Sequence, residues 1–411
     1  MSVSITGQSV YSGSIFYYDT YNVKSYVGEP TTNRNQQISN YTGTNYADGT
    51  EWSSDPTRFS KTYTASIATP IGFGATLCSE TATAGYYHLS SMGGGSESGE
   101  HSISCYIYPL SSITNFTIGM LNDGGNMVTF DFTTGAITYG GSIENRNAFM
   151  STVVGFPGWY RVGANIEGRF GGWVGCVGLS TNTSYTPSAP YKSFYITGLQ
   201  YEYKNHCTPY VFGTRSNTQG LLDLVGTSTL ELTNAGYNTS GSITFNGSSN
   251  YIIASENPAF NTQTPSVEVW IKTNNTNQNG FWFEKGNVNT QYSLFQEGTV
   301  IQWRQNIGGV TNLSTTTATY ISTANWAHVV GTYTSGARKL YIDGVLVNSD
   351  NQSGTINTNT NGISMGVYGG YNGARGYYYN GLIGMVRVYN RVLSADEVLR
   401  NYNISKARYG R

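Results

Sequence analysis

The chain has 411 residues and a formal net charge of −1, from 22 Lys and Arg against 23 Asp and Glu. Charged residues are 11% of the total, well below the roughly 25% of an ordinary soluble domain, and this excludes the basic surface that nucleic acids or polybasic membrane docking require. The 34 Tyr, 16 Phe and 7 Trp exclude a disordered chain, and the 51 Gly are typical of a protein built from strands and turns.

The start of the chain, residues 1–7, lacks the positive charge and apolar run of a secretory signal peptide. No apolar stretch reaches transmembrane length, so we expect no membrane insertion. Four cysteines are too few for a disulfide scaffold, and buried free thiols fit better. They are Cys78, Cys105, Cys176 and Cys207. We therefore expect a protein that is made in a cytoplasm.

In the first half of the chain, short alternating runs predict strands separated by turns. Residues 101–109 alternate between apolar and polar side chains, as a half-buried strand does. Residues 127–132 and 136–139 flank Thr133-Thr134-Gly135 and predict a hairpin. Further strands are expected at residues 158–162, 193–196 and 199–203.

The second half carries sharper strand signals. In residues 267–272 the small apolar side chains face one way, and Glu268, Trp270 and Lys272 face the other. Asp343-Gly344, between two alternating runs, is the strongest short-range hairpin signal in the chain.

One short helix is expected near the C-terminus, at residues 393–400. Ser394 and Glu397 have the spacing of a capping box, and Leu393 can pack against Val398 across the helix start. Everything else is strand and loop. The fold class predicted is all-β, with two β-sandwich domains of jelly-roll or concanavalin A-like type and one short C-terminal helix.

The C-terminal half resembles the laminin-G-like domains of the concanavalin A-like lectin/glucanase superfamily. The most specific motifs are Trp326-Ala327-His328-Val329-Val330-Gly331-Thr332-Tyr333 and Leu340-Tyr341-Ile342-Asp343-Gly344. Other motifs follow in the family's order at residues 242–247, 250–252, 267–272, 283–287 and 381–391. The resemblance implies a lectin-like sandwich over residues 213–411. We predict no cofactor and place no metal site. Some relatives carry Ca²⁺, so this ion stays open as an alternative, but no Asp-rich loop here is dense enough to place it.

The preceding region resembles jelly-roll, carbohydrate-binding-module-like domains of tailed-phage virion proteins. The motifs are at residues 129–135, 158–162, 198–202 and 208–210, and they imply a second domain over residues 34–212. Residues 18–28 resemble the segment that opens many phage and bacterial laminin-G-like chains. We therefore expect residues 1–33 to belong to the C-terminal sandwich, with the jelly roll inserted between its parts.

A catalytic role is not favoured by the carboxylates of the sequence. Retaining glucanases need two carboxylates about 5 Å apart, and their Glu-x-Asp-x-x-Glu strand is missing. Glu268 stands alone on its strand and is interpreted as a solvent-face or cross-strand charge. Asp343 is explained as a turn residue, and Asp396 and Glu397 as helix-start residues. We predict no catalytic residue and no enzyme.

Two groups with histidine have competing interpretations. Glu97 and Glu100 beside His101 could hold a metal ion, but a solvated loop is the favoured interpretation. His328 follows the family's strand pattern, which favours a packed structural histidine over a catalytic base.

Glycan binding would use exposed aromatic rings, which stack on the apolar faces of sugars. The candidate residues are Trp282, Trp303, Tyr292, Tyr371 and the Tyr377-Tyr378-Tyr379 triple, of which Tyr378 is the central member. Packing in the core or at an interface is the alternative for each of them, because aromatic residues dominate both settings.

The leading hypothesis is a structural virion protein of a tailed bacteriophage, such as a fibre, tail, neck or head-decoration appendage. It would be assembled in the host cytoplasm, contact other virion proteins and form a homo-oligomer, with a trimer favoured by the resemblance. Its lectin-like domains would contact host-surface glycans. The alternative is a free bacterial or environmental carbohydrate-binding protein, and a glycan hydrolase comes third.

Overall fold

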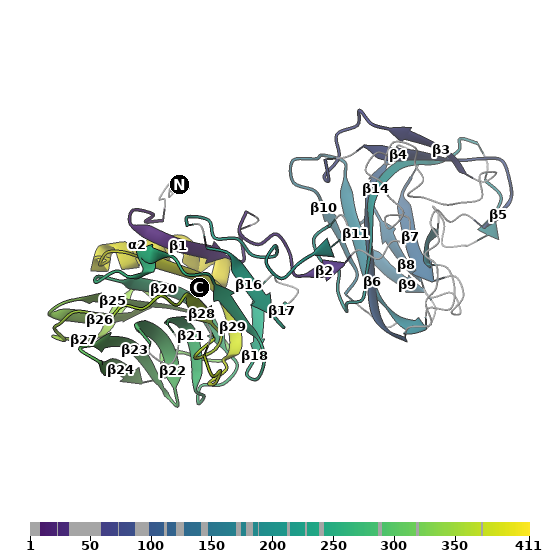
Figure 1. Cartoon of the computed structure of the whole chain (residues 1–411). Coiled ribbons are helices and arrows are strands. Elements are labelled where there is room, and N and C mark those ends of the chain that lie inside the picture. The colour runs from purple at the N-terminus through teal and green to yellow at the C-terminus, as the bar shows by residue number, and fades with distance from the viewer. Residues whose placement is uncertain are drawn as a thin grey trace. The chain divides into compact units, whose positions relative to one another are not determined.

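The computed structural model describes residues 9–22, 24–32, 59–72, 74–86, 98–110, 113–120, 127–140, 147–169, 174–177, 184–187, 189–211, 214–226, 228–237, 242–286, 290–317, 320–370 and 373–411. It divides into two compact units (Figure 1). The C-terminal sandwich combines the N-terminal residues up to Pro30 with Ser216–Arg411, and the inserted unit is Thr31–Arg215. The sequence predicted divisions after residues 33 and 212, and the structure places them after residues 30 and 215.

The inserted unit contains two antiparallel sheets around one apolar core. Cys105 and Ile107 from one sheet and Phe116 and Phe130 from the other contribute completely buried side chains to that core. The six-stranded sheet has the order β10 (Phe149–Thr152), β11 (Tyr160–Arg169), β6 (Ser98–Pro109), β14 (Ser193–Glu202), β4 (Ala75–Glu80) and β3 (Phe59–Thr64). The four-stranded sheet has the order β12 (Val174–Val177), β7 (Asn115–Met120), β8 (Met127–Asp131) and β9 (Ile137–Gly140). Two short pairs complete the unit, β13 (Ser184–Tyr185) with β5 (Gly85–Tyr86) and β15 (Thr214–Arg215) with β2 (Thr31–Thr32).

The C-terminal sandwich consists of two larger sheets. The eight-stranded sheet runs β17 (Gly236–Tyr237), β18 (Ile243–Asn246), β29 (Asn380–Tyr389), β20 (Ser266–Thr273), β25 (Ala327–Thr334), β26 (Ala337–Ile342) and β27 (Val345–Asp350), and β1 (Ser14–Asp19) also pairs with β29. The seven-stranded sheet runs β16 (Leu230–Thr233), β19 (Tyr251–Ala254), β28 (Ile363–Met365), β21 (Gly280–Lys285), β22 (Tyr292–Glu297), β23 (Val300–Ile307) and β24 (Val310–Thr317).

Strand β1 joins a partner more than 360 residues away along the chain. Phe16 lies opposite Val388 and Asp19 lies opposite Met385 in an antiparallel ladder. The Phe16 side chain is completely buried in the core of the C-terminal sandwich. The N-terminal segment is therefore a strand of this sandwich, and the inserted unit follows it in the chain.

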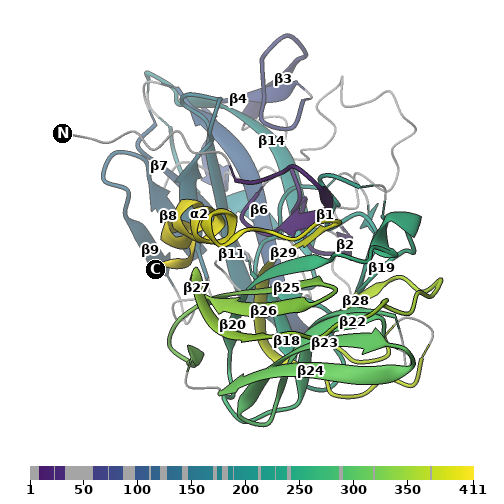
Figure 2. The ribbon, with the colours of Figure 1, turned by 90° about the vertical axis from the view of Figure 1, so that its left-hand side faces the viewer.

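The helix α2 (Ala395–Ser405) is the only α-helix of the described residues, and the predicted all-β class is confirmed. Its capping box is present, since Ser394 Oγ accepts from Glu397 N at 3.2 Å and Glu397 Oε2 accepts from Ser394 N at 2.9 Å. Short 3-10 helices lie at Pro258–Phe260 and Lys406–Tyr409. Figure 2 shows α2 and strands β22 to β24 on opposite sides of the sandwich. Within the described part of the chain, no helix has the length and apolar content of a membrane span.

The predicted Asp-Gly hairpin joins β26 to β27. Asp343 and Gly344 both have positive φ, of 50° and 82°. These are the left-handed conformations that a two-residue type I′ turn requires and that Asp-Gly adopts readily.

Candidate functional site

The outer face of the seven-stranded sheet, which we call the open face, carries a pocket with a volume of about 310 Å³. Side chains alternate along its strands, so Trp303 enters the core while Arg304 lines the pocket. The lining residues are Asn279, Phe281, Phe295, Gln296, Glu297, Arg304, Tyr368 and Tyr377.

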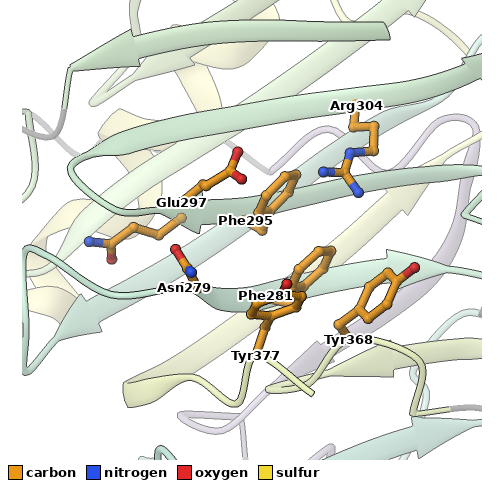
Figure 3. Close-up of a pocket in the computed structure, with 8 residues that line it drawn as sticks. Asn279, Phe281, Phe295, Glu297, Arg304, Tyr368 and Tyr377 are labelled. Carbon is orange, nitrogen blue, oxygen red and sulfur yellow. The ribbon is translucent and has the colours of Figure 1, made fainter. Parts of the chain in front are cut away.

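Four of these side chains form a continuous stack (Figure 3). The Arg304 guanidinium lies 4.4 Å from the Phe295 ring centroid. Phe295 and Phe281 are parallel with centroids 4.3 Å apart, and Tyr377 stacks on Phe281 at 6.4 Å. Phe281 and Phe295 are each only 2% exposed, whereas Tyr377 is 56% exposed. The two phenylalanines are thus the floor of the pocket, and Tyr377 is its accessible ring.

A β-bulge places Phe281 on the open face. The register of β21 with β22 shifts between Phe281 and Phe283, and both Trp282 and Phe283 belong to the core. A bulge adds one residue to one strand and so changes which side chains face outwards. Without it, strict alternation would send Phe281 and Phe283 to the same face.

The connection between β28 and β29 supplies the two tyrosines. Tyr368 and Gly376 exchange backbone hydrogen bonds of 2.9 and 3.1 Å, and Phe281 N donates to Tyr377 O at 3.4 Å. Tyr377 has a φ of 49°, which is rare for a residue with a side chain and costs conformational energy. Tyr377 is held in this conformation at the rim of the pocket.

Arg304 brings a positive charge that lacks a direct partner. Its guanidinium makes no hydrogen bond or ion pair with another described residue, and its Nε is buried without a partner. Burial lowers the pKa of Arg304, while Glu297 is the main neighbour that opposes this shift. Glu297 itself accepts a hydrogen bond from Gln302 at 3.0 Å.

Glu284 lies behind the pocket and is completely buried. Its Oε1 accepts from Thr290 Oγ1 at 2.6 Å, and its Oε2 accepts from Gly369 N at 2.7 Å and from Ser364 Oγ at 3.2 Å. Burial raises the pKa of the Glu284 carboxyl to about 7, although these hydrogen bonds and the more distant Arg304 charge lower it. Glu284 therefore holds the connection between β28 and β29, which contains Tyr368, and it does not pair with Arg304.

Three of the residues that were predicted to contact glycans lie in the core and not on the surface. Trp282, Trp303 and Tyr292 are completely buried, so their rings are not accessible to a sugar and this part of the prediction is wrong. Trp303 Nε1 donates to Thr332 O at 3.1 Å, and a Cβ on Gly331 would lie 2.4 Å from the Trp303 ring. The Trp303 ring therefore packs directly against β25 of the opposite sheet.

Tyr378 and Tyr371 are the other two residues that were predicted to contact glycans. Tyr378 is partly exposed but does not line the pocket, and Tyr371 lies outside the described residues. Tyr377, from the same triple, is the accessible ring. Phe281, Phe295, Arg304 and Tyr368 were missed, because no local pattern distinguishes outward from inward aromatic residues in a bulged strand.

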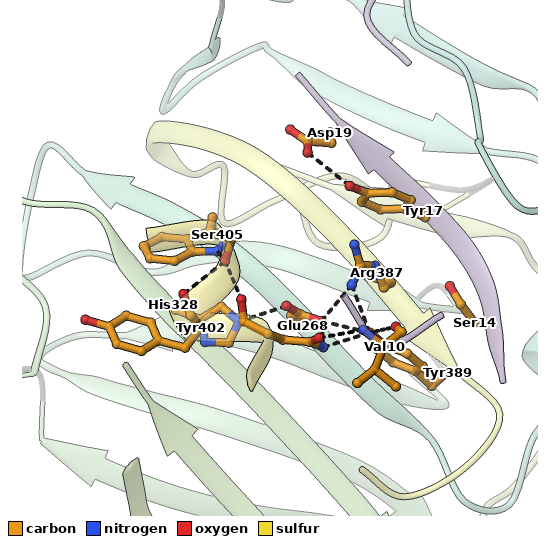
Figure 4. A network of polar contacts seen from close by, with 12 residues as sticks. Val10, Ser14, Tyr17, Asp19, Glu268, His328, Arg387, Tyr389, Tyr402 and Ser405 are labelled. Atoms are coloured by element: carbon orange, nitrogen blue, oxygen red, sulfur yellow. Dashed lines mark hydrogen bonds and ion pairs between the residues drawn. The ribbon is translucent and has the colours of Figure 1, made fainter. Parts of the chain in front are cut away.

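The outer face of the eight-stranded sheet, which we call the closed face, contains Glu268 (Figure 4). Glu268 is 1% exposed, so the predicted solvent-face position is wrong. The alternative prediction, a cross-strand charge, is confirmed, because Glu268 lies opposite Arg387 on the neighbouring strand. His328 Nε2 donates to its Oε1 at 2.9 Å, Asn401 Nδ2 donates to its Oε2 at 2.9 Å, and Arg387 Nη1 lies 3.6 Å from Oε2. Burial alone would raise the pKa of Glu268, but Arg387 and His328 lower it to about 2.

The closed face is covered by α2 and the N-terminal segment. Trp270 Nε1 donates to Ser405 Oγ at 2.9 Å, and Val10 N donates to Asn401 Oδ1 at 2.9 Å. The Arg387 guanidinium lies 4.0 Å from the Tyr17 ring centroid. His328 is completely buried, as a packed structural histidine is.

The remaining candidate groups lie in the inserted unit. The Cys78 and Cys105 side chains are buried, as predicted, and Cys207 is partly buried. Burial raises the pKa of the Cys207 thiol to about 12. Cys176 is described only in its backbone, and Glu97 lies outside the described residues. In the described part of the chain, no three His, Cys, Asp or Glu side chains gather as metal ligands would.

Comparisons with known proteins find one family match, which lies within the second half of the chain. Residues 246–399 match the family model described as the concanavalin A-like lectin/glucanases superfamily. This part of the C-terminal sandwich is therefore a concanavalin A-like domain, as the sequence motifs predicted. No curated protein sequence matches the chain.

Solved structures that match part of this chain include binding domains of botulinum neurotoxins. The binding domain of botulinum neurotoxin serotype D is 20% identical, with a TM-score of 0.38 over 46% of this chain and 50% of that chain. Binding domains of botulinum neurotoxin DC, in complex with SialylT and with rat synaptotagmin II, are 16% and 15% identical with the same score and coverage. The chain thus spans about half the length of these structures.

Proposed function

We propose that the C-terminal sandwich binds a glycan and that the pocket of the open face is its binding site. The observation that carries the proposal is the stack that ends in the exposed Tyr377 ring, with Asn279, Glu297 and Arg304 around it. Sugars present apolar C–H faces that pack on aromatic rings, and hydroxyl groups that bond to amide, carboxylate and guanidinium groups. The concanavalin A-like fold of residues 246–399 is compatible with this role.

The carboxylates favour binding over hydrolysis. Glycoside hydrolysis normally requires two carboxyl groups on either side of the bond that is broken. Among the residues that line the pocket, Glu297 alone carries a carboxylate. Glu284 has both oxygens occupied by hydrogen bonds, and Glu268 lies on the closed face. This arrangement supports our proposal of a glycan-binding module over that of a hydrolase.

For the biological setting, we propose a homo-oligomeric appendage of a tailed-phage particle, with a trimer favoured. The support is the sequence: the low charge content, the many Tyr, Gly and Asn residues, and the resemblance of residues 34–212 to virion jelly rolls. A virion protein should sediment with purified particles and give a uniform symmetric oligomer in light scattering. A monomer that is retained on polysaccharide columns would favour the free carbohydrate-binding protein instead.

Binding at the pocket is tested with Tyr377→Ala and a matched control. Tyr320 is also an exposed tyrosine, at 46%, and it does not line the pocket. A glycan array with the full chain identifies the strongest ligand, and calorimetry then compares the two variants. We expect Tyr377→Ala to weaken binding about fivefold, since an aromatic contact contributes on the order of 1 kcal/mol. Equal affinities for Tyr377→Ala and Tyr320→Ala would exclude the pocket as the site.

A further inference from the structure

We infer that the pocket selects acidic sugars, and that Arg304 binds the sugar carboxylate. This inference rests on the proposed function, since it names the ligand class of the same site. The class is a glycan whose rings carry a carboxylate, as uronic acids and sialic acids do.

The first support is the state of the Arg304 charge. A guanidinium that is partly removed from water costs free energy unless a counter-charge or hydrogen-bond acceptors accompany it. Arg304 makes no direct ion pair or hydrogen bond with a described residue, although the Glu297 charge lies near enough to oppose the lowering of its pKa by burial. A bound carboxylate would supply both the charge and the acceptors.

The second support is that the neighbouring acids are already engaged. Glu297 accepts from Gln302, and the two oxygens of Glu284 accept from Thr290, Ser364 and Gly369. With a pKa of about 7, Glu284 is also a weak counter-charge at neutral pH. Neither acid accepts a hydrogen bond from Arg304, so the guanidinium donors are left for a ligand.

The third support is geometric. The guanidinium lies against Phe295, which is itself stacked on Phe281, so the aromatic floor restricts its orientation. Its Nε is buried, which leaves the two Nη groups as the donors that a ligand can reach. A planar guanidinium fork binds the two oxygens of a carboxylate in parallel, as a lysine ammonium does not. Tyr368 and Tyr377 line the same pocket and add hydroxyl groups.

The experiment uses two pairs of probes that differ only in whether the carboxylate is free or esterified. Oligogalacturonate is compared with its methyl ester, and α2,3-sialyllactose is compared with its methyl ester, each by calorimetry on the full chain. The variants are Arg304→Gln, which removes the charge, and Arg304→Lys, which keeps the charge without the fork. Lys339→Gln on β26 of the opposite sheet is the control for net charge.

The expected result is that one acidic probe binds the wild-type chain about 10- to 100-fold more tightly than its neutral partner, as a charged hydrogen-bonded pair would give. Arg304→Gln should abolish that preference, Arg304→Lys should retain part of it, and Lys339→Gln should leave it unchanged. Which probe pair shows the preference distinguishes a uronic from a sialic acid.

Two results would overturn the inference, and they differ in what they say of the proposed function. Equal binding of acidic and neutral partners, with loss of both in Tyr377→Ala, would reject the role of Arg304 while the glycan site stands. No binding of any array glycan would reject both. The paired probes on the wild-type chain decide the question even if Arg304→Gln does not fold.

Discussion

Arg387 and Arg304 of the C-terminal sandwich both stack on aromatic rings, but only Arg387 has a carboxylate as a close, buried partner. On the closed face, Arg387 lies over Tyr17 and faces Glu268, which is tied to His328 and Asn401. On the open face, Arg304 lies over Phe295 and faces a pocket. The first arrangement is a completed structural network under α2. The second leaves a charge and an exposed Tyr377 ring unused by the fold, and this is what a ligand site requires.

This contrast predicts that the network around Glu268 on the closed face contributes strongly to the free energy of unfolding. Glu268→Ala would leave Arg387 buried without its counter-charge, and we expect a loss of about 3–5 kcal/mol in the free energy of unfolding of the C-terminal sandwich. Urea unfolding of the full chain measures it. The control is Glu231→Ala at an exposed position of β16, with an expected loss below about 1 kcal/mol. Similar losses in the two variants would contradict the structural role of Glu268.

The two buried glutamates also predict opposite responses to pH. The folded-state pKa of Glu284 is raised from 4.5 to about 7, so the folded state binds its proton more tightly than the unfolded chain does. Its contribution is fully present below pH 4.5 and is lost as the pH rises through 7, by up to about 3 kcal/mol. The pKa of Glu268 is lowered to about 2, so its contribution is present above pH 4.5 and is lost as the pH falls towards 2.

Urea unfolding between pH 4.5 and 7.5 separates these responses. Glu284→Gln should remove the loss of stability between pH 4.5 and 7, whereas Glu231→Gln should keep it. An identical pH dependence in wild type and Glu284→Gln would show that Glu284 does not hold its proton in the folded state.

A smaller effect is expected at the start of α2. Ser394→Ala removes the cap that accepts from Glu397 N, and typically such a loss costs about 1 kcal/mol. Because α2 covers the closed face, glycan affinity at the open face should stay unchanged. Ser353→Ala, at an exposed turn, is the control and should change the unfolding midpoint little. A change in glycan affinity in Ser394→Ala would show that the two faces are coupled.

The smallest stability effect is expected at the pocket rim. Tyr377→Ala removes an exposed ring from a residue with positive φ, and we expect the free energy of unfolding to change by less than about 0.5 kcal/mol. Thermal unfolding of the variant used in the binding experiment checks this. A loss above about 2 kcal/mol would make Tyr377 a residue of the fold rather than of the site.

The sequence was informative where the signal is local or where a motif is long. The Ser394–Glu397 capping box and the Asp343-Gly344 turn depend on a few adjacent residues, and both are present as predicted. The fold class followed from alternation and turn residues. The resemblance of residues 246–399 to the concanavalin A-like family needed motifs in order over a long stretch, and the family match confirms it.

The sequence was uninformative about which aromatic residues face outwards. Trp282 and Phe281 are adjacent aromatic residues, and the sequence does not indicate which of them faces outwards. The bulge in β21 determines that Phe281 does. Glu268 alternates with apolar residues as a surface residue would, but α2 covers its face, and that contact joins segments 133 residues apart. Arg304 is identified as a site residue by the pocket that it lines and by the Phe295 ring on which it stacks. These are tertiary properties, and no local pattern contains them.

The most direct test of the account is to locate the bound glycan on the wild-type chain by amide hydrogen exchange. The strongest ligand from the array is added at saturation, and protection is compared with the free protein. We predict added protection in β21 to β23 and in residues 373–379, which surround the pocket. Protection confined to the closed face or to Thr31–Arg215 would contradict the assignment of the open face as the binding site.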